Sequence, residues 1–224
     1  MRAVGRTTDL VPSAEDLAAK KEFIEAFFDE LQQRVDLTGK LARDFGNEAR
    51  LLCCCHIEGL GNWLNPNLAG GPARVFVKVV ADHGGDPRLL LVLPKRLADS
   101  LPWKSASPAV AAEIQGALAA LPRDQAYTES EFLAALPPTT TADALSFVSR
   151  EVWRGTVASI AYEHIRSSGV HWLGSSSGVS FSGTTHHGTP LETVDYEMLR
   201  GALDRILGHA REVSISSGKW FGHT

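Results

Sequence analysis

Two side chains near the three-quarter point of the chain are of types that could handle a phosphate ester together. Arg166 and His171 lie five positions apart in the segment YEHIRSSGVHW, residues 162–172. Arginine binds phosphate oxygens through paired hydrogen bonds, and histidine exchanges protons near neutral pH. A helix would splay the two side chains, but Gly169 ends it and lets His171 swing back toward Arg166. The spacing is compatible with a reactive pair, and also with a helix end whose dipole is stabilised by two cationic side chains.

A long helix must position this pair. Residues 141–169 follow a helical pattern that ends in a glycine, the usual left-handed terminator. One apolar stripe comprises Trp153, Val157, Ile160 and His164. We therefore expect His164 to be a packing residue rather than a catalyst. The opposite face carries Gly155, Ser159, Tyr162 and Arg166. Because these are small or polar-tipped, that face is predicted to meet solvent or a close partner, with Arg166 presented rather than buried.

Most of the remaining chain is also predicted to be helical. Amphipathic or capped patterns occupy residues 13–35, 47–64, 109–121, a segment opened by the TESE capping box at 128–131, and 194–213. Gly59 and Gly61 would allow a neighbouring helix to approach the second of these closely. Residues 74–93 instead favour a β-hairpin with a Gly-Gly turn, inserted between helices. Residues 174–189 are rich in Gly, Ser and Thr and predict a loop or weak hairpin. The expected fold is mainly α, one domain over residues 1–224.

Composition narrows the classes of function. Of the 224 residues, 44% are hydrophobic and 21% are charged, which is typical of a folded globular protein. The net charge of -4 gives no overall basic field for nonspecific binding of duplex nucleic acid. No stretch is apolar enough to span a membrane and no signal-peptide core precedes the domain, so we expect a cytoplasmic protein without a membrane partner. The consecutive Cys53, Cys54 and Cys55 cannot converge on one ion from a helix, and we expect them to pack.

The motif resembles that of a known family. IRSSGVH is similar to the R-polar-x-x-x-H signature of HEPN domains, and GNEARLLCCCHIEGLG resembles their first helical hairpin. The resemblance implies an antiparallel helical bundle, with residues 74–93 as an embellishment. Many members are metal-independent endoribonucleases, so it implies RNA as the partner, no cofactor and no metal. It also implies a homodimer with a composite site, and a toxin or defence effector that is controlled by an antitoxin or another protein partner.

The same resemblance implies roles for individual residues. Arg166 and His171 would be catalytic, since RNA supplies its own 2′-hydroxyl nucleophile and needs only proton transfer and a cation at the phosphoryl group. Ser167 stands where active members often have Asn, Asp or His, and its hydroxyl can still donate and accept hydrogen bonds. Tyr162, one turn before Arg166, could stack on a base or orient the arginine, with packing as the alternative. We thus assign Ser167 and Tyr162 to substrate binding.

Other interpretations stay open or are set aside. A catalytically silent HEPN-like module that binds RNA, a nucleotide or a protein is the main alternative, and a pure scaffold is a third. Gly218 and Lys219 do not form a P-loop, because Val213 and Trp220 occupy positions that need glycine and Ser or Thr. A metal hydrolase would draw on His56, His83, His186 and His187. These histidines lack the usual helical ligand spacings, which argues against it. The loop carrying His186 and His187 could close over RNA or serve as a connector.

Overall fold

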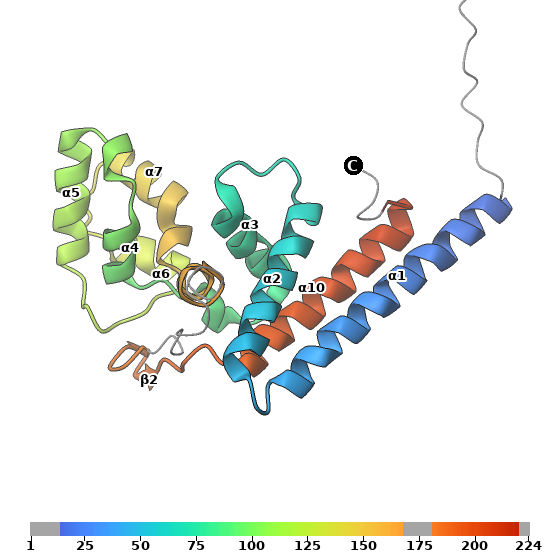
Figure 1. The fold of residues 1–224 in the computed structure, drawn as a ribbon. Helices are drawn as coiled ribbons and strands as arrows, with labels where there is room; N and C mark the ends of the chain where they lie inside the picture. The colour runs from blue at the N-terminus through green and yellow to red at the C-terminus, as the bar shows by residue number, and fades with distance from the viewer. Residues whose placement is uncertain (1–13, 168–180, 220–224) are drawn as a thin grey trace, which may run out of the picture.

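A computed structural model describes residues 14–167 and 181–219, and this part of the chain is mainly helical, as the sequence predicts (Figure 1). The α-helices are α1 (Ala14–Leu41), α2 (Gly46–Leu64), α3 (Gly71–Val79), α4 (Pro94–Ser100), α5 (Pro108–Ala119), α6 (Glu129–Ala135), α7 (Ala142–Glu151), α8 (Val157–Ala161) and α10 (Tyr196–Ser217). Short 3₁₀ helices are η2 (Pro87–Leu90), η3 (Trp103–Ser105) and η4 (Val152–Gly155), and π-helical turns are η1 (Val80–Gly84) and η5 (Tyr162–Ser167). No helix within the described ranges has the length and apolarity to cross a membrane.

Three long helices form the frame of one half of the molecule. α1 and α10 run antiparallel, because contacts at increasing positions of one fall at decreasing positions of the other (Figure 1). Their cross-links are Asp29 with Arg211, Asp36 with Arg200 and Thr38 with Tyr196. α2 follows α1 through a short turn and packs against both α1 and α10. Gly61 lets α3 approach α2, since an added Cβ there would lie 3.0 Å from the side chains of Val75 and Val79. The open space at Gly59 shows that only Gly61 plays the predicted role.

The buried hydrophobic residues that the structure describes form two clusters. The first, which we call the motif half, is built by α1, α2, α3, α8, η5 and α10 and contains the fully buried Phe28, Phe76 and Leu203. The second, which we call the short-helix half, is built by α4 to α7 and contains Ile114 and Phe132. The two halves lie side by side in Figure 1, with the short helices on the left.

An extended segment joins the two halves. Leu91 and Leu93 pack into the motif half, whereas Val92 between them packs into the short-helix half. This alternation is that of a strand, whose successive side chains point to opposite faces. Val92 exchanges two backbone hydrogen bonds with Tyr127, at 2.7 and 3.0 Å, and the Leu93 amide donates to the Gly155 carbonyl at 2.9 Å. The junction is therefore a backbone-paired seam rather than a flexible linker.

The hairpin predicted at residues 74–93 is wrong, because this segment is α3, η1 and η2. Its alternating Val and Phe residues suggested a strand, but they are buried on nearly every side between α2 and α8, and burial overrides β-propensity. The polar residues Arg74, Lys78 and Asp82 recur every four positions, which is helical spacing, and Lys78 pairs with Asp82. Gly85, with φ of +69°, follows the π-turn as a left-handed cap.

The structure contains a hairpin elsewhere, within the described part of the predicted Gly/Ser/Thr-rich loop. β1 (Thr185–His186) pairs antiparallel with β2 (Thr189–Pro190), and Thr185 is opposite Pro190. The two turn residues, His187 and Gly188, have φ of +50° and +77°. Two positive φ angles are typical of the type I′ turn that connects two-residue hairpins.

The single helix predicted over residues 141–169 is divided into α7, η4, α8 and η5 in its described part. The break occurs at Gly155, where an added Cβ would lie 2.7 Å from the Leu97 Cβ. Thr156 then has extended backbone and caps α8 by accepting from the Ser159 amide at 3.2 Å. Contact with α4 therefore ends one helix and starts another, which helical periodicity alone does not reveal.

Candidate functional site

The structure ties the motif arginine to the second helix. Arg166 lies in η5, and its Nε and Nη2 donate to the Glu58 carboxylate of α2 at 2.5 and 3.4 Å. The Tyr162 hydroxyl donates to the same carboxylate at 3.3 Å, and the guanidinium lies 5.9 Å from the Tyr162 ring centre. The side chain of Glu58 is 13% exposed and that of Arg166 is 27% exposed. Arg166 is thus held at a fixed place, with part of its surface still open.

Burial and charge set the protonation of this group. Desolvation, followed by the negative charge of Glu58, raises the pKa of Tyr162 to about 12, so the phenol stays neutral and can donate. Desolvation opposes the charge on Arg166, but hydrogen bonding and attraction to Glu58 outweigh it and raise the pKa of the guanidinium. Arg166 is a permanent cation whose nearest counter-charge is the carboxylate of Glu58.

The face predicted to meet solvent or a partner is covered by the protein itself. Gly155, Ser159 and Tyr162 are all buried, and the Tyr162 ring packs against Phe76 of α3 at a centroid distance of 5.4 Å. In this structure the Tyr162 ring is part of the core. Its role in substrate binding stays a prediction. Ser167, at the end of η5, is half-buried next to Arg166. His171 lies outside the described residues.

His164 is exposed, and its predicted core position is wrong. Its Nε2 lies 2.9 Å from the Arg96 guanidinium, at the surface where α4 meets η5. The cause is the π-helical turn, whose i→i+5 hydrogen bonds rotate the following residues relative to an α-helix. Ile165 takes the core position instead. Cys53 and Cys54 are buried as expected, and desolvation raises the pKa of Cys53 to about 11, which keeps its thiol neutral.

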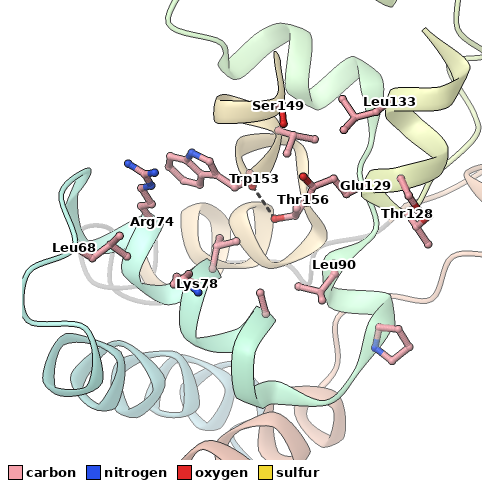
Figure 2. Close-up of a pocket in the computed structure, with 15 residues that line it drawn as sticks. Leu68, Arg74, Lys78, Leu90, Thr128, Glu129, Leu133, Ser149, Trp153 and Thr156 are labelled. Atoms are coloured by element: carbon pink, nitrogen blue, oxygen red, sulfur yellow. Dashed lines mark hydrogen bonds between the residues drawn. The ribbon is translucent and has the colours of Figure 1, made fainter. Parts of the chain in front are cut away.

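A cavity lies where the two halves of the molecule face each other. Its volume is about 740 Å³, and Figure 2 shows side chains entering it from α3 on one side and from α6, α7 and η4 on the other. Its lining is mostly apolar and includes Val77, Leu90, Leu133, Val152 and Trp153. Two cations, Arg74 and Lys78, also line it, but Arg74 donates to the Ala69 carbonyl and Lys78 pairs with Asp82. The sequence offered no signal for this cavity, since its walls come from segments far apart in the chain, such as Lys78 of α3 and Thr128 before α6.

The structure also brings together three ionisable side chains that the ligand spacings in the sequence did not indicate. His186 and His187 of the hairpin both approach Glu131 of α6, whose carboxylate also accepts from the Thr128 amide in the confirmed capping box. That backbone hydrogen bond, followed by the one to His186, lowers the pKa of Glu131 to about 2. Among the described residues, these three can place their ligand atoms around one ion. The spacing of His186 and His187 argued against a metal site because metal ligands on a helix are usually three or four residues apart. The left-handed backbone of His187 instead lets two adjacent histidines face the same carboxylate.

Comparison of this chain with protein-family models, curated proteins and solved structures finds no match. The geometry around Arg166 and the motif that contains it are therefore what indicate a function for this chain.

Proposed function

We propose that the protein is a HEPN-like, metal-independent endoribonuclease that acts as a homodimer, with Arg166 and His171 as its catalytic residues. The proposal is carried by one observation: Glu58 and Tyr162 hold the Arg166 guanidinium at the end of the motif helix with 27% of its side chain exposed. A cation that is already oriented stabilises developing negative charge without reorganising during the reaction. His171 follows five residues later, across a spacer that contains glycine.

The chemistry follows from what RNA provides. The ribose 2′-hydroxyl attacks the adjacent phosphorus while a histidine, acting as base, takes its proton. Arg166 stabilises the charge on the non-bridging oxygens, and the bond from phosphorus to the 5′-oxygen breaks as a second histidine donates a proton to that oxygen. The products are a 2′,3′-cyclic phosphate and a free 5′-hydroxyl. One chain supplies one motif histidine, so the acid would be the partner's His171, and the site is incomplete in a monomer.

The same ion pair also favours a second candidate function. The Glu58 carboxylate already neutralises Arg166, and a paired guanidinium binds a phosphate less strongly than a free one. This pairing favours a catalytically silent HEPN-like module, in which Arg166 is structural and another surface binds RNA, a nucleotide or a protein. In either case the protein could act with an antitoxin or serve as a defence effector.

RNA cleavage in excess chelator tests the proposal. Purified full-length protein is incubated with structured and single-stranded RNAs, beside the variants Arg166→Ala and His171→Ala and the exposed control Arg123→Ala. Each catalytic substitution should slow cleavage by at least about 100-fold, whereas Arg123→Ala should cleave normally. Cleavage that produces 2′,3′-cyclic ends and falls off on dilution below the dimer dissociation constant would support the composite site.

The variant Glu58→Gln tests whether the Glu58–Arg166 pair orients the guanidinium for cleavage, and the wild type itself separates the two candidates. The amide keeps the shape of the carboxylate and one hydrogen bond to Arg166 but removes the charge. For the ribonuclease we expect a folded protein that cleaves roughly tenfold more slowly, because the guanidinium is less well oriented. A folded, dimeric wild type that cuts none of the RNAs would reject the ribonuclease and leave the silent module.

A further inference from the structure

The hairpin turn places two histidine rings on one side. In a strand, adjacent residues point to opposite faces, so His186 and His187 would normally diverge. His187 instead has a left-handed backbone, with φ of +50°, which is uncommon for a residue other than glycine. The two rings consequently lie 4.2 Å apart between centroids. Their side chains are 25% and 68% exposed, so ions in solution can reach both.

Both rings direct the same nitrogen at one carboxylate. The Nε2 atoms of His186 and His187 lie 3.1 and 2.7 Å from the two oxygens of Glu131, and the three ligand atoms fall within 4.8 Å of one another. Two ligands of a tetrahedral zinc ion are about 3.3 Å apart, given metal–ligand bonds of about 2.0 to 2.1 Å. Shifts of the side chains alone would therefore bring all three atoms to bonding distance of one ion.

The backbone holds these side chains in place before any ion arrives. The Ala126 amide donates to the Thr185 carbonyl and the Thr185 amide donates to the Asp124 carbonyl, both at 2.8 Å, so the hairpin is fixed to the segment that leads into α6. Glu131 is fixed through the capping box, in which its carboxylate accepts from the Thr128 amide at 2.7 Å. Ligands that are already ordered lose little conformational entropy on binding.

We propose that Glu131, His186 and His187 bind one divalent transition-metal ion of the Zn²⁺ class. Two neutral imidazoles and a carboxylate suit Zn²⁺, whereas Mg²⁺ and Ca²⁺ require sets of oxygen ligands. Three protein ligands leave a coordination position for water or an added ligand. A hollow of about 350 Å³ adjoins the two histidines and is also lined by Arg88 and Leu191, so there is room for that fourth ligand.

Zinc binding to the full-length protein tests the site, and it does so without RNA. Protein treated with chelator and then desalted is titrated with Zn²⁺ by calorimetry, and Co²⁺ is used to record the absorption of a four-coordinate ion. We expect one ion per chain in the wild type and in the control His164→Ala, which removes an exposed histidine outside the trio. His186→Ala and His187→Ala should each weaken binding by at least about 100-fold. His187 is the most exposed of the three, so its replacement should leave the fold intact.

Two results would contradict the proposed zinc site. Failure of the wild type to bind Zn²⁺ would overturn the proposal. Unchanged affinity in His187→Ala and Glu131→Gln would also do so, because it would place the ion elsewhere, for instance at the stacked pair of His83 and His209. Since RNA cleavage is measured in excess chelator and zinc binding in its absence, either proposal can fail without the other.

Discussion

The two halves of the molecule reach helical structure by different means. α1, α2 and α10 of the motif half have 28, 19 and 22 residues, whereas α4 to α7 of the short-helix half have between 7 and 12. A long helix can rely on an amphipathic face, but a helix of two turns is marginal unless its ends are satisfied. Side-chain caps therefore begin α5, α6 and α7, at Ser107, Thr128 and Thr141. α4 has no side-chain cap and begins at Pro94, whereas of the long helices α10 is capped at Asp195 and α2 is not. The halves therefore differ mainly in helix length, and capping is more general among the short helices.

The largest expected effect tests whether the two halves are one cooperative unit. Phe132 is fully buried in the short-helix half, and Phe132→Ala should lower the free energy of unfolding by about 4 kcal/mol, because it removes a large apolar side chain and leaves a cavity. The seam at residues 91–93 should couple the halves, so urea unfolding is expected to stay a single transition by circular dichroism and by tryptophan fluorescence. The control Phe45→Ala, at an exposed position, should change stability by less than about 1 kcal/mol. Two separate transitions would mean that the short-helix half unfolds independently.

A matched pair of glycine substitutions tests the seam itself. Gly155→Ala places a Cβ 2.7 Å from the Leu97 Cβ and 3.3 Å from its Cα, so α4 must move and stability should fall by about 2 kcal/mol. Gly59→Ala meets nothing within 4 Å in α2 and should stabilise the protein by up to about 1 kcal/mol, through helix propensity. Thermal and urea unfolding of both variants measures the difference. Equal effects would show that the approach of α4 to Gly155 contributes nothing to joining the halves.

The smallest expected effect is on the pH dependence of the free energy of unfolding. We expect it to arise in the motif half. Residues 94–151 contain no histidine, whereas burial, assisted by the charge of Arg34, lowers the pKa of His56 in α2 below 6.5. As pH falls through 6.5, the imidazole of His56 takes up a proton in the unfolded chain before it does so in the folded protein. The contribution of neutral His56 to the free energy of unfolding is therefore complete above pH 6.5 and decreases as pH falls from 6.5 to the pKa in the folded state. His56→Gln should reduce the loss of stability between pH 7.5 and 5.5 by up to about 1 kcal/mol.

The control for this measurement is His164→Gln, which alters an exposed histidine of the same half. It measures how far replacing a histidine by glutamine at an exposed position changes the free energy of unfolding. An unchanged profile in His56→Gln would mean that the neutral-range dependence comes from elsewhere, such as His83, whose pKa is also lowered by desolvation and by His209.

Sequence reasoning succeeded where the signal was local. The amphipathic pattern predicted α1 and α10, and the run around Cys53 and Cys54 predicted α2 and its buried thiols. The TESE capping box is present as expected at Thr128 and Glu131, since both hydrogen bonds of such a box lie within four residues. Each of these features depends on neighbours along the chain.

The sequence-based predictions were wrong where contact with a distant segment determined the local backbone structure. Valine and phenylalanine at residues 75–80 have strand propensity, yet burial against α2 on one side and α8 on the other makes them helical. The helix after Thr141 is regular in pattern, yet contact with Leu97 breaks it at Gly155, and the later π-turn exposes His164 and buries Ile165. The environment of every side chain beyond such a break changes with it.

The amino-acid sequence by itself determined the long helices, the capping box that begins α6 and the presence of an arginine–histidine motif, because propensity, periodicity and capping act within a few residues. Only the tertiary structure decided which charges meet. Glu58 and Arg166 are 108 residues apart and Glu131 and His186 are 55 apart, and no local rule pairs them. Such pairs form where tertiary packing brings distant parts of the backbone together, and burial of Glu58 makes an unpaired charge there unfavourable.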